Sequence, residues 1–265
     1  MKKVFFLTML VLGLLACTGQ NNPSDPSSYK KNGQLSGVFS VSETQTVHFS
    51  QGNLQYQAST NTWRFAEHQY DTIGNANSNI SSTYSGWIDL FGWGTGSNPT
   101  NTSTNYSPYS TFVDWGVNAI SNGGNTPNQW RTLTGDEWGY LLQIRINATT
   151  LLSRATVNGV HGYIILPDDF VLPIGLNFYA NSDDWSTNVY TNLEWSNLEV
   201  AGAVFLPAAG IRRGTEVLSV GSGGVYWSTT PSDTDKAYYL DFYSEGFLPQ
   251  GLGTRYFGQS VRLVR

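Results

Sequence analysis

The sequence predicts an α+β fold, and three observations lead to this prediction. Aromatic residues make up 14% of the 265 residues and charged residues only 12%, against about 25% charged residues in an average globular protein, so the chain can bury enough apolar surface to fold. Short runs of β-branched and aromatic residues separated by Asn, Ser, Thr and Gly predict strands. Two capping boxes in the middle of the chain predict helices. Strands, then helices, then strands define the α+β class.

Residues 1–16 have the pattern of an export signal, in which Lys2 and Lys3 precede the apolar stretch Val4–Leu15. The stretch is too short to span a bilayer comfortably. The sequence Leu14-Leu15-Ala16-Cys17 resembles the lipobox of bacterial lipoproteins. The resemblance implies cleavage before Cys17, the single cysteine, and palmitate-type lipidation of its thiol. We therefore expect a lipid-anchored protein of the bacterial cell envelope, in the outer membrane of a Bacteroidetes-type cell. The alternative is an ordinary secretory signal.

Residues 17–36 lack apolar periodicity and are expected to form a lipid-anchored flexible tether. Residues 37–129 are expected to form a β-rich part that packs on the rest of the chain. It begins with a meander of short strands at residues 37–41, 46–49, 53–56 and 63–65. Residues 71–128 are polar but contain many aromatic residues, which we expect to pin irregular loops to a core.

Residues 130–265 contain the clearest local signals. Thr134-Gly135-Asp136-Glu137 and Thr191-Asn192-Leu193-Glu194 are capping boxes, so a helix is expected to begin at each. Between them, residues 155–167 predict two strands joined by an Asn158-Gly159 turn. Further strands are expected at residues 203–207, 226–228, 237–243 and 260–264.

Four segments of this part resemble the FISUMP and Lcl C-terminal families. They are Trp130-Arg131-Thr132-Leu133-Thr134 with Glu137-Trp138, Val225–Thr230, Ala237–Phe242 and Ser260–Arg265. The resemblance implies a C-type-lectin-like fold, related to that of formylglycine-generating enzymes, on exported lipoproteins. Leu133-Thr134, Thr229 and Leu263 depart from the usual family pattern, and none of these departures affects the fold argument.

The composition and motifs give no support to catalysis, and no catalytic residue, metal or cofactor is assigned. The single cysteine is at the expected lipid anchor, which excludes a thiol mechanism of the formylglycine-generating type. Asp168-Asp169 and Asp183-Asp184 are expected to be solvated loop residues, with a Ca²⁺ site as the alternative. Arg212-Arg213 is expected to be a surface pair in a loop. A net charge of −5 argues against nucleic acid as a partner.

A candidate ligand-binding face lies near the C-terminus. Alternation along residues 237–243 places Leu240 and Phe242 on one side and Tyr239, Asp241 and Tyr243 on the other. Residues 244–257 form a turn-rich segment, and tyrosines framed by Gly and Ser are typical of binding surfaces. The complete candidate set is Tyr239, Asp241, Tyr243, Glu245, Phe247, Tyr256 and Phe257, on a scaffold of Trp227, Leu240, Phe242, Gly246 and Val261.

These features predict an exported, lipid-anchored binding protein with an unknown protein or glycan partner. A resemblance of residues 225–265 to target proteins of diversity-generating retroelements implies that the candidate face is variable. One alternative is a carbohydrate-active enzyme of the same fold without cysteine chemistry, which predicts a deep cleft with ionisable groups of perturbed pKa. The other is a structural component of the envelope or of a fimbria-like assembly, which predicts an exposed or donated strand.

Overall fold

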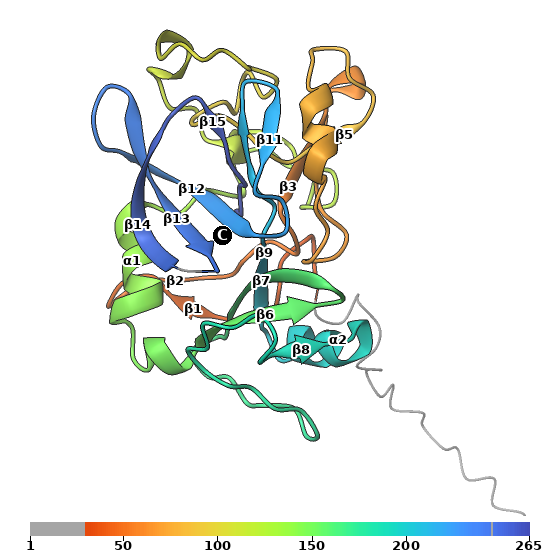
Figure 1. The fold of residues 1–265 in the computed structure, drawn as a ribbon, viewed down its shortest axis with the longest axis vertical. Coiled ribbons are helices and arrows are strands. Elements are labelled where there is room, and N and C mark those ends of the chain that lie inside the picture. Colours follow the sequence, from red (N-terminus) through yellow and green to blue (C-terminus); the bar gives the residue numbers. More distant parts are fainter. Residues whose placement is uncertain (1–29, 245) are drawn as a thin grey trace, which may run out of the picture.

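The computed structural model describes residues 30–244 and 246–265. The expected signal peptide, Cys17, most of the expected tether and Glu245 lie outside these residues. The described chain has an α+β fold with many short strands and few short helices, which confirms the predicted class (Figure 1). In this part of the chain, no helix combines the length and apolar character that crossing a membrane requires.

The strands are grouped into five small sheets. Their bounds are β1 Phe39–Ser40, β2 Thr46–Val47, β3 Leu54–Gln57, β4 Thr62–Phe65, β5 Trp87–Ile88, β6 Leu152–Val157, β7 Val160–Ile165, β8 Val189–Tyr190, β9 Val204–Pro207, β10 Ile211–Arg213, β11 Glu216–Leu218, β12 Gly223–Pro231, β13 Lys236–Tyr243, β14 Gly246–Thr254 and β15 Phe257–Gly258. The sheet orders are β1-β2, β4-β3-β5, β8-β6-β7-β9, β12-β13-β14 and β11-β10-β15. All pairs are antiparallel except β6 with β8.

The helical elements are short. The α-helices are α1 Gly135–Gly139 and α2 Asn192–Val200, and one π-helical turn, Tyr140–Ile144, continues α1. Single 3₁₀ segments occupy Ala58–Thr60, Gly74–Asn79, Ser107–Tyr109, Trp115–Val117 and Ala148–Thr150. Both capping boxes form as predicted, since the Thr134 and Thr191 hydroxyls accept from the amides of Glu137 and Glu194.

Local turn chemistry explains the central hairpin. Asn158 and Gly159 both have positive φ, at 49° and 80°, which is the conformation of a type I′ turn between β6 and β7. The predicted hairpin is therefore confirmed. The predicted meander is only partly present, because β1-β2 and β3-β4 are hairpins of separate sheets. The last predicted strand, residues 260–264, makes isolated bridges instead.

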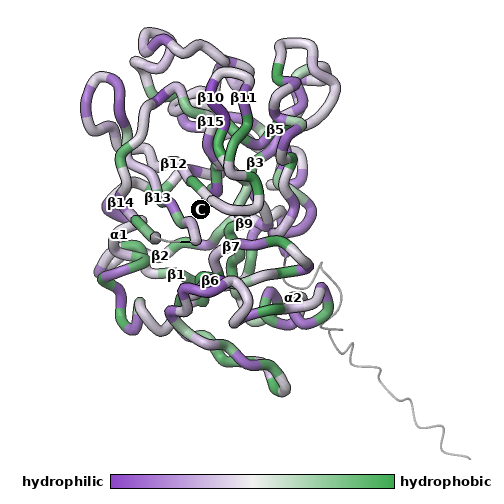
Figure 2. Tube along the Cα trace, in the orientation of Figure 1, coloured by the Kyte–Doolittle hydropathy of each residue, from purple (hydrophilic) through white to green (hydrophobic). Residues whose placement is uncertain are grey.

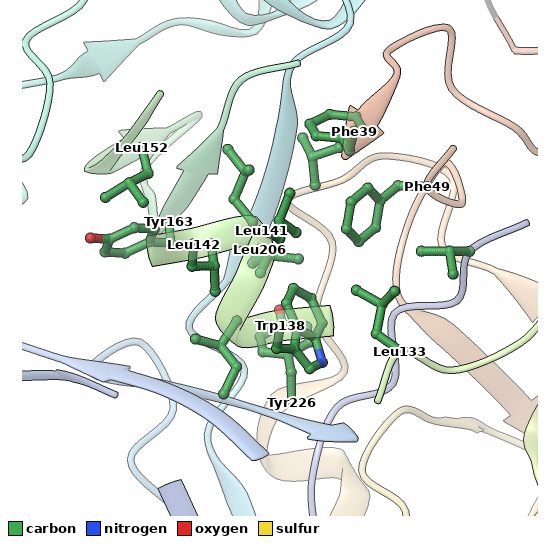
Figure 3. Close-up of a cluster of buried hydrophobic side chains, with 14 of the residues drawn as sticks. Phe39, Phe49, Leu133, Trp138, Leu141, Leu142, Leu152, Tyr163, Leu206 and Tyr226 are labelled. Atoms are coloured by element: carbon green, nitrogen blue, oxygen red, sulfur yellow. The ribbon is translucent and has the colours of Figure 1, made fainter. Parts of the chain in front are cut away.

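Three buried clusters form the core, and all three draw on residues from both sides of position 129/130. In the first cluster the rings of Phe39 and Phe49 meet edge to face at 5.0 Å, and Phe49 lies 6.0 Å from Trp138 of α1 (Figure 3). In the second, Leu54 and Trp63 pack in one group with Trp227. The expected β-rich part and the C-terminal part therefore share their cores. The third cluster joins the β6–β9 sheet to α2.

Most aromatic residues of the long irregular region are buried as predicted, whereas Tyr106 is 43% exposed and Trp87 is only partly buried. Phe91, Tyr109 and Trp115 are fully buried, and Trp93 nearly so. The Trp93 indole donates to the carbonyl of Ser228 at 3.0 Å. These side chains fix a region with little regular structure to the C-terminal sheet.

Residues 246–254 are a strand, and the prediction of a turn-rich segment there is wrong. Gly246, Pro249, Gly251 and Gly253 suggested turns, but β14 is the edge strand of its sheet, where Pro is tolerated. A shift in register between Tyr239 and Asp241 also makes room on the β14 side. The glycines accommodate neighbouring rings, as described below.

Both arginines lie in strand β10 and Arg212 is fully buried, so the prediction of a surface pair in a loop is wrong; only Arg213 is exposed. Arg212 lies in β10 and its guanidinium donates to the carbonyl oxygens of Leu90 and Gly214. Burial lowers the pKa of Arg212 to about 10. Main-chain acceptors from the adjacent turn and from the distant Leu90 make this burial possible, and no local sequence pattern predicts the distant one.

Candidate ligand-binding face

The side chains of β13 alternate between the two faces of its sheet, as the sequence pattern predicts. Leu240 and Phe242 are buried in the first core cluster. Tyr239, Asp241 and Tyr243 point to the opposite side and are half-buried. We call these three residues, together with the glycines beneath their rings, the β13 face. It lies on the β12-β13-β14 sheet (Figure 1).

Glycines on both neighbouring strands leave space for the two tyrosine rings. A Cβ atom on Gly251 or Gly253 of β14 would lie 2.4 or 2.3 Å from the ring of Tyr239. A Cβ atom on Gly223 of β12 would lie 2.2 Å from the ring of Tyr243. Tyr239 therefore lies across β14 and Tyr243 lies across β12. The two rings diverge from each other, and Asp241 lies between them on β13.

The Asp241 carboxyl group occupies a partly desolvated position. Its cross-strand neighbours are Val225 on β12 and Leu248 on β14. Burial raises the pKa of Asp241 to about 6, although a hydrogen bond from the Leu248 amide opposes this shift. Burial also raises the pKa of Tyr239 to about 12 and raises that of Tyr243, with the Asp241 charge adding to both. A carboxylate flanked by two aromatic rings is thus held at a half-exposed surface.

Gln259 extends the β13 face on its buried side, and the sequence analysis missed it. Its amide nitrogen would lie 3.3 Å from a Cβ atom on Gly253, next to the Tyr239 ring. The side chain is 1% exposed, and its Oε1 accepts no hydrogen bond from any described residue. Trp227 closes the same end with an edge-to-face contact to Tyr239 at 6.2 Å. Nothing in the local sequence around Gln259, which lies near the C-terminus, predicts that this residue is next to Tyr239.

The other predicted site residues lie elsewhere. Phe247 is on the core side of the sheet, where its ring stacks on Tyr163 at 4.7 Å. Tyr256 contacts Phe257 at 5.1 Å and Tyr106 at 5.6 Å, in a separate cluster at the tip of β15. Glu245 lies outside the described residues. The structure therefore brings together Tyr239, Asp241 and Tyr243, and it places Phe247, Tyr256 and Phe257 apart from them.

The predicted scaffold largely has a supporting role. Trp227, Leu240, Phe242 and Val261 are buried, with at most 1% exposure. Gly246 is exposed at the start of β14, and a Cβ atom there would meet nothing within 4 Å.

The acidic pairs lie outside the helices and strands, but the expectation of simply solvated residues is wrong for Asp168, which binds segments distant in the sequence. Asp168 forms an ion pair with Arg145 at 2.8 Å and accepts from the Ser40 amide and hydroxyl. Asp184 accepts from the amide and hydroxyl of Ser186, which lowers its pKa. Among residues 30–244 and 246–265, no group of three or more His, Cys, Asp and Glu side chains is placed to hold a metal ion.

One further carboxyl group is deeply buried. Asp89 accepts from the Ile73 amide at 2.9 Å and from the Asn77 side chain at 2.7 Å. Desolvation raises its pKa to about 6 despite these hydrogen bonds. Both hydrogen-bond donors lie in the segment between β4 and β5, where they satisfy the two carboxylate oxygens. Asp89 therefore holds this segment in place.

Comparison with known proteins gives no relative for this chain: no family model, no curated protein and no solved structure matches it.

Proposed function

We propose that this chain is an exported, lipid-anchored binding protein of the bacterial cell envelope, which presents the β13 face to a protein or glycan partner. Lipidation of Cys17 supplies the anchor. Residues 130–265 provide a C-type-lectin-like scaffold, as the segments resembling the FISUMP and Lcl C-terminal families imply. The proposal assigns no catalytic residue and no cofactor.

One observation supports the binding site above all others. Asp241 lies between two tyrosine rings that the glycines of β12 and β14 allow to lie across the sheet. Such rings offer broad, rigid contact area at small entropic cost. They stack on sugar rings or on cationic groups. The carboxylate accepts hydrogen bonds from hydroxyl, ammonium or guanidinium groups.

The half-buried position of the two tyrosines supports the same location. Tyr239 packs against the second core cluster, but neither ring is enclosed completely, as a core side chain would be.

Binding of the polypeptide of residues 18–265 to a glycan array, to cationic peptides and to whole cells tests the proposal. Asp241→Asn and the double variant Tyr239→Ala/Tyr243→Ala remove the charge and the rings. The matched controls are Asp169→Asn and Tyr179→Ala, which change exposed residues away from the β13 face. Circular dichroism confirms that every variant is folded.

We expect the β13-face variants to lose binding at least about tenfold, because centrally placed aromatic anchors dominate such interfaces. The controls should bind like the parent. Equal binding by all variants would move the site elsewhere, first to the Tyr106-Tyr256-Phe257 cluster. A ligand bound through its positive charge should be released as the pH falls below about 6, where Asp241 is protonated, whereas a neutral glycan should not.

A further inference from the structure

An arm of the chain between β7 and β8 displays apolar side chains to solvent. It comprises residues 167–187 and extends from the lower end of the molecule (Figure 1). Val171 is 77% exposed, Ile174 is fully exposed and Leu172 is also exposed. Figure 2 shows this hydrophobic stretch near the end of the arm. Three aliphatic side chains within four residues are a concentrated apolar surface.

The arm is a fixed structure. Phe170, Leu176 and Phe178 pack against the third core cluster. Asn188, which is buried, accepts from the Tyr179 amide at 2.9 Å and donates to the Tyr179 carbonyl. The Tyr190 hydroxyl donates to the Asn177 carbonyl at 2.6 Å. Half of the apolar residues of the arm thus hold it in place, and the other half point away.

The base of the arm lies beside the N-terminal segment of the described chain. The Asp168 amide donates to the Val38 carbonyl at 3.0 Å. A surface depression lies where three parts of the chain meet. It is lined by Ser36, Gly37 and Val38 of the N-terminal segment, by Pro167, Asp169 and Val171 of the arm, and by Val200 and Ala201 at the end of α2. Lys30 forms an ion pair with Glu199 of α2 at 2.9 Å. The tether to Cys17 therefore leaves the molecule at the end that carries the arm.

Further exposed aliphatic side chains surround this end. Ile144 and Ile146 are 68% and 86% exposed and flank Arg145, whose guanidinium binds Asp168 at the base of the arm. Leu193 is exposed on α2. The arm itself carries no Lys or Arg, and the two cations described at this end, Lys30 and Arg145, are paired with Glu199 and Asp168. Contact through this surface would depend on apolar burial and not on positive charge.

We infer that this end of the protein docks on the lipid bilayer, with Val171, Leu172 and Ile174 entering the boundary between headgroups and acyl chains. The inference rests on the proposed lipid anchor at Cys17. Lys30 is 13 positions after Cys17, and 13 residues reach at most about 45 Å even when fully extended, so anchoring at Cys17 keeps this end of the molecule near the membrane. Docking then fixes the orientation of the molecule on the membrane.

A fluorescent probe tests this contact in the full lipoprotein. Once Cys17 is acylated, Ile174→Cys provides the only free thiol for an environment-sensitive dye. The matched site is Leu248→Cys, which is 57% exposed on the β12-β13-β14 sheet. In phosphatidylcholine vesicles we expect the dye at position 174 to shift to shorter wavelength and to be quenched by brominated lipid. The dye at position 248 should do neither.

A second measurement separates docking from anchoring. The polypeptide of residues 18–265, without acyl chains, should float weakly with phosphatidylcholine vesicles. Val171→Ser/Leu172→Ser/Ile174→Ser should reduce this partitioning at least about tenfold, while the control Leu218→Ser/Val220→Ser/Leu248→Ser should not. Added salt should leave it unchanged, and anionic lipid should weaken it, because of Asp168, Asp169, Asp183 and Asp184.

The outcomes are distinguishable. If the protein fails to be acylated but the polypeptide still partitions through the arm, the anchor proposal fails and the docking inference stands. If the acylated protein is anchored but the dye at position 174 behaves like that at position 248, the docking inference is overturned. A wavelength shift that depends on protein concentration without lipid would instead identify a second copy of the chain as the partner.

Discussion

The Asp241 carboxyl group opposes folding at neutral pH, because its position raises its pKa from 3.8 to about 6. The folded state therefore binds more protons than the unfolded state between these two values, and stability falls as the pH rises through about 4 to 6. A full shift of this size is worth about 3 kcal/mol, and solvent screening at a half-exposed site reduces it to about 1 kcal/mol.

Asp241→Asn should remove this cost while keeping the oxygen that accepts from Leu248. We expect the free energy of unfolding to rise by about 1 kcal/mol at pH 7.5 and to change little at pH 4. Urea unfolding at both pH values measures the difference. Asp89 titrates in the same window, so only the difference between variant and parent isolates Asp241. An equal effect at both pH values would show that the charge is not responsible.

Gly251 holds space for the Tyr239 ring, and Gly246 on the same strand does not hold space for any side chain. Gly251→Ala should displace the ring and destabilise the fold by about 1 to 3 kcal/mol, as overpacking does. Gly246→Ala should change stability by less than about 0.5 kcal/mol. Thermal unfolding of both variants checks this contrast. If both variants were equally stable, the position of the Tyr239 ring would not require a glycine at position 251.

At the scale of single elements, the capping box of α1 joins two local interactions. The Thr134 amide donates to Glu137 at 2.8 Å, and the same carboxylate binds Arg131 at 2.6 Å. Thr134→Ala should cost about 1 kcal/mol, because the Glu137 amide loses its acceptor. Thr134→Ser keeps the hydroxyl and should cost much less. Chemical denaturation measures both, and equal losses would indicate that the methyl group matters more than the cap.

Elements defined by neighbours in sequence could be predicted, and elements defined by distant partners could not. Both capping boxes and the Asn158-Gly159 turn need only a few adjacent residues, so their patterns were sufficient. Strand β14 looked like a series of turns because its glycines serve the ring of Tyr239 on β13. For the candidate site, alternation identified Tyr239, Asp241 and Tyr243, whereas Gln259 comes from the segment after β15, which lies outside the alternating pattern of β13.

At the scale of the whole molecule, a buried polar network joins distant parts of the sequence. The Gln69 side chain is fully buried and donates to Glu199 and to the Ala203 carbonyl, each at 3.0 Å. Its oxygen accepts from the Phe205 amide and from Arg262. Arg262 in turn donates to Asn53 and lies near the end of the chain. One amide thus satisfies groups from the middle and the C-terminus.

Gln69→Leu conserves the approximate volume but leaves these buried partners without hydrogen bonds. We expect it to lower the free energy of unfolding by about 3 kcal/mol or more, since unsatisfied buried polar and charged groups are costly. Gln143→Leu, at an exposed position, is the control and should cost less than about 0.5 kcal/mol. A small loss in Gln69→Leu would mean that water replaces the amide.

The shared cores make a strong prediction about the division of the chain at residues 129/130. A segment of residues 130–265 lacks Phe39 and Phe49, which pack in one cluster with Trp138, and lacks Leu54 and Trp63 of the second cluster. Loss of these side chains would expose much of the remaining apolar core. We therefore expect residues 130–265 alone to be unfolded, with no cooperative thermal transition.

Residues 30–265 should instead unfold in one cooperative transition, seen at the same temperature by near-ultraviolet and far-ultraviolet circular dichroism. Mixing the segments 30–129 and 130–265 should restore part of the native signal, because all core residues are then present. Independent folding of residues 130–265 would show that this part is a domain in its own right. The C-type-lectin-like scaffold is proposed for that part alone, so failure of residues 130–265 to fold by themselves would mean that the N-terminal residues complete the scaffold on which the β13 face depends.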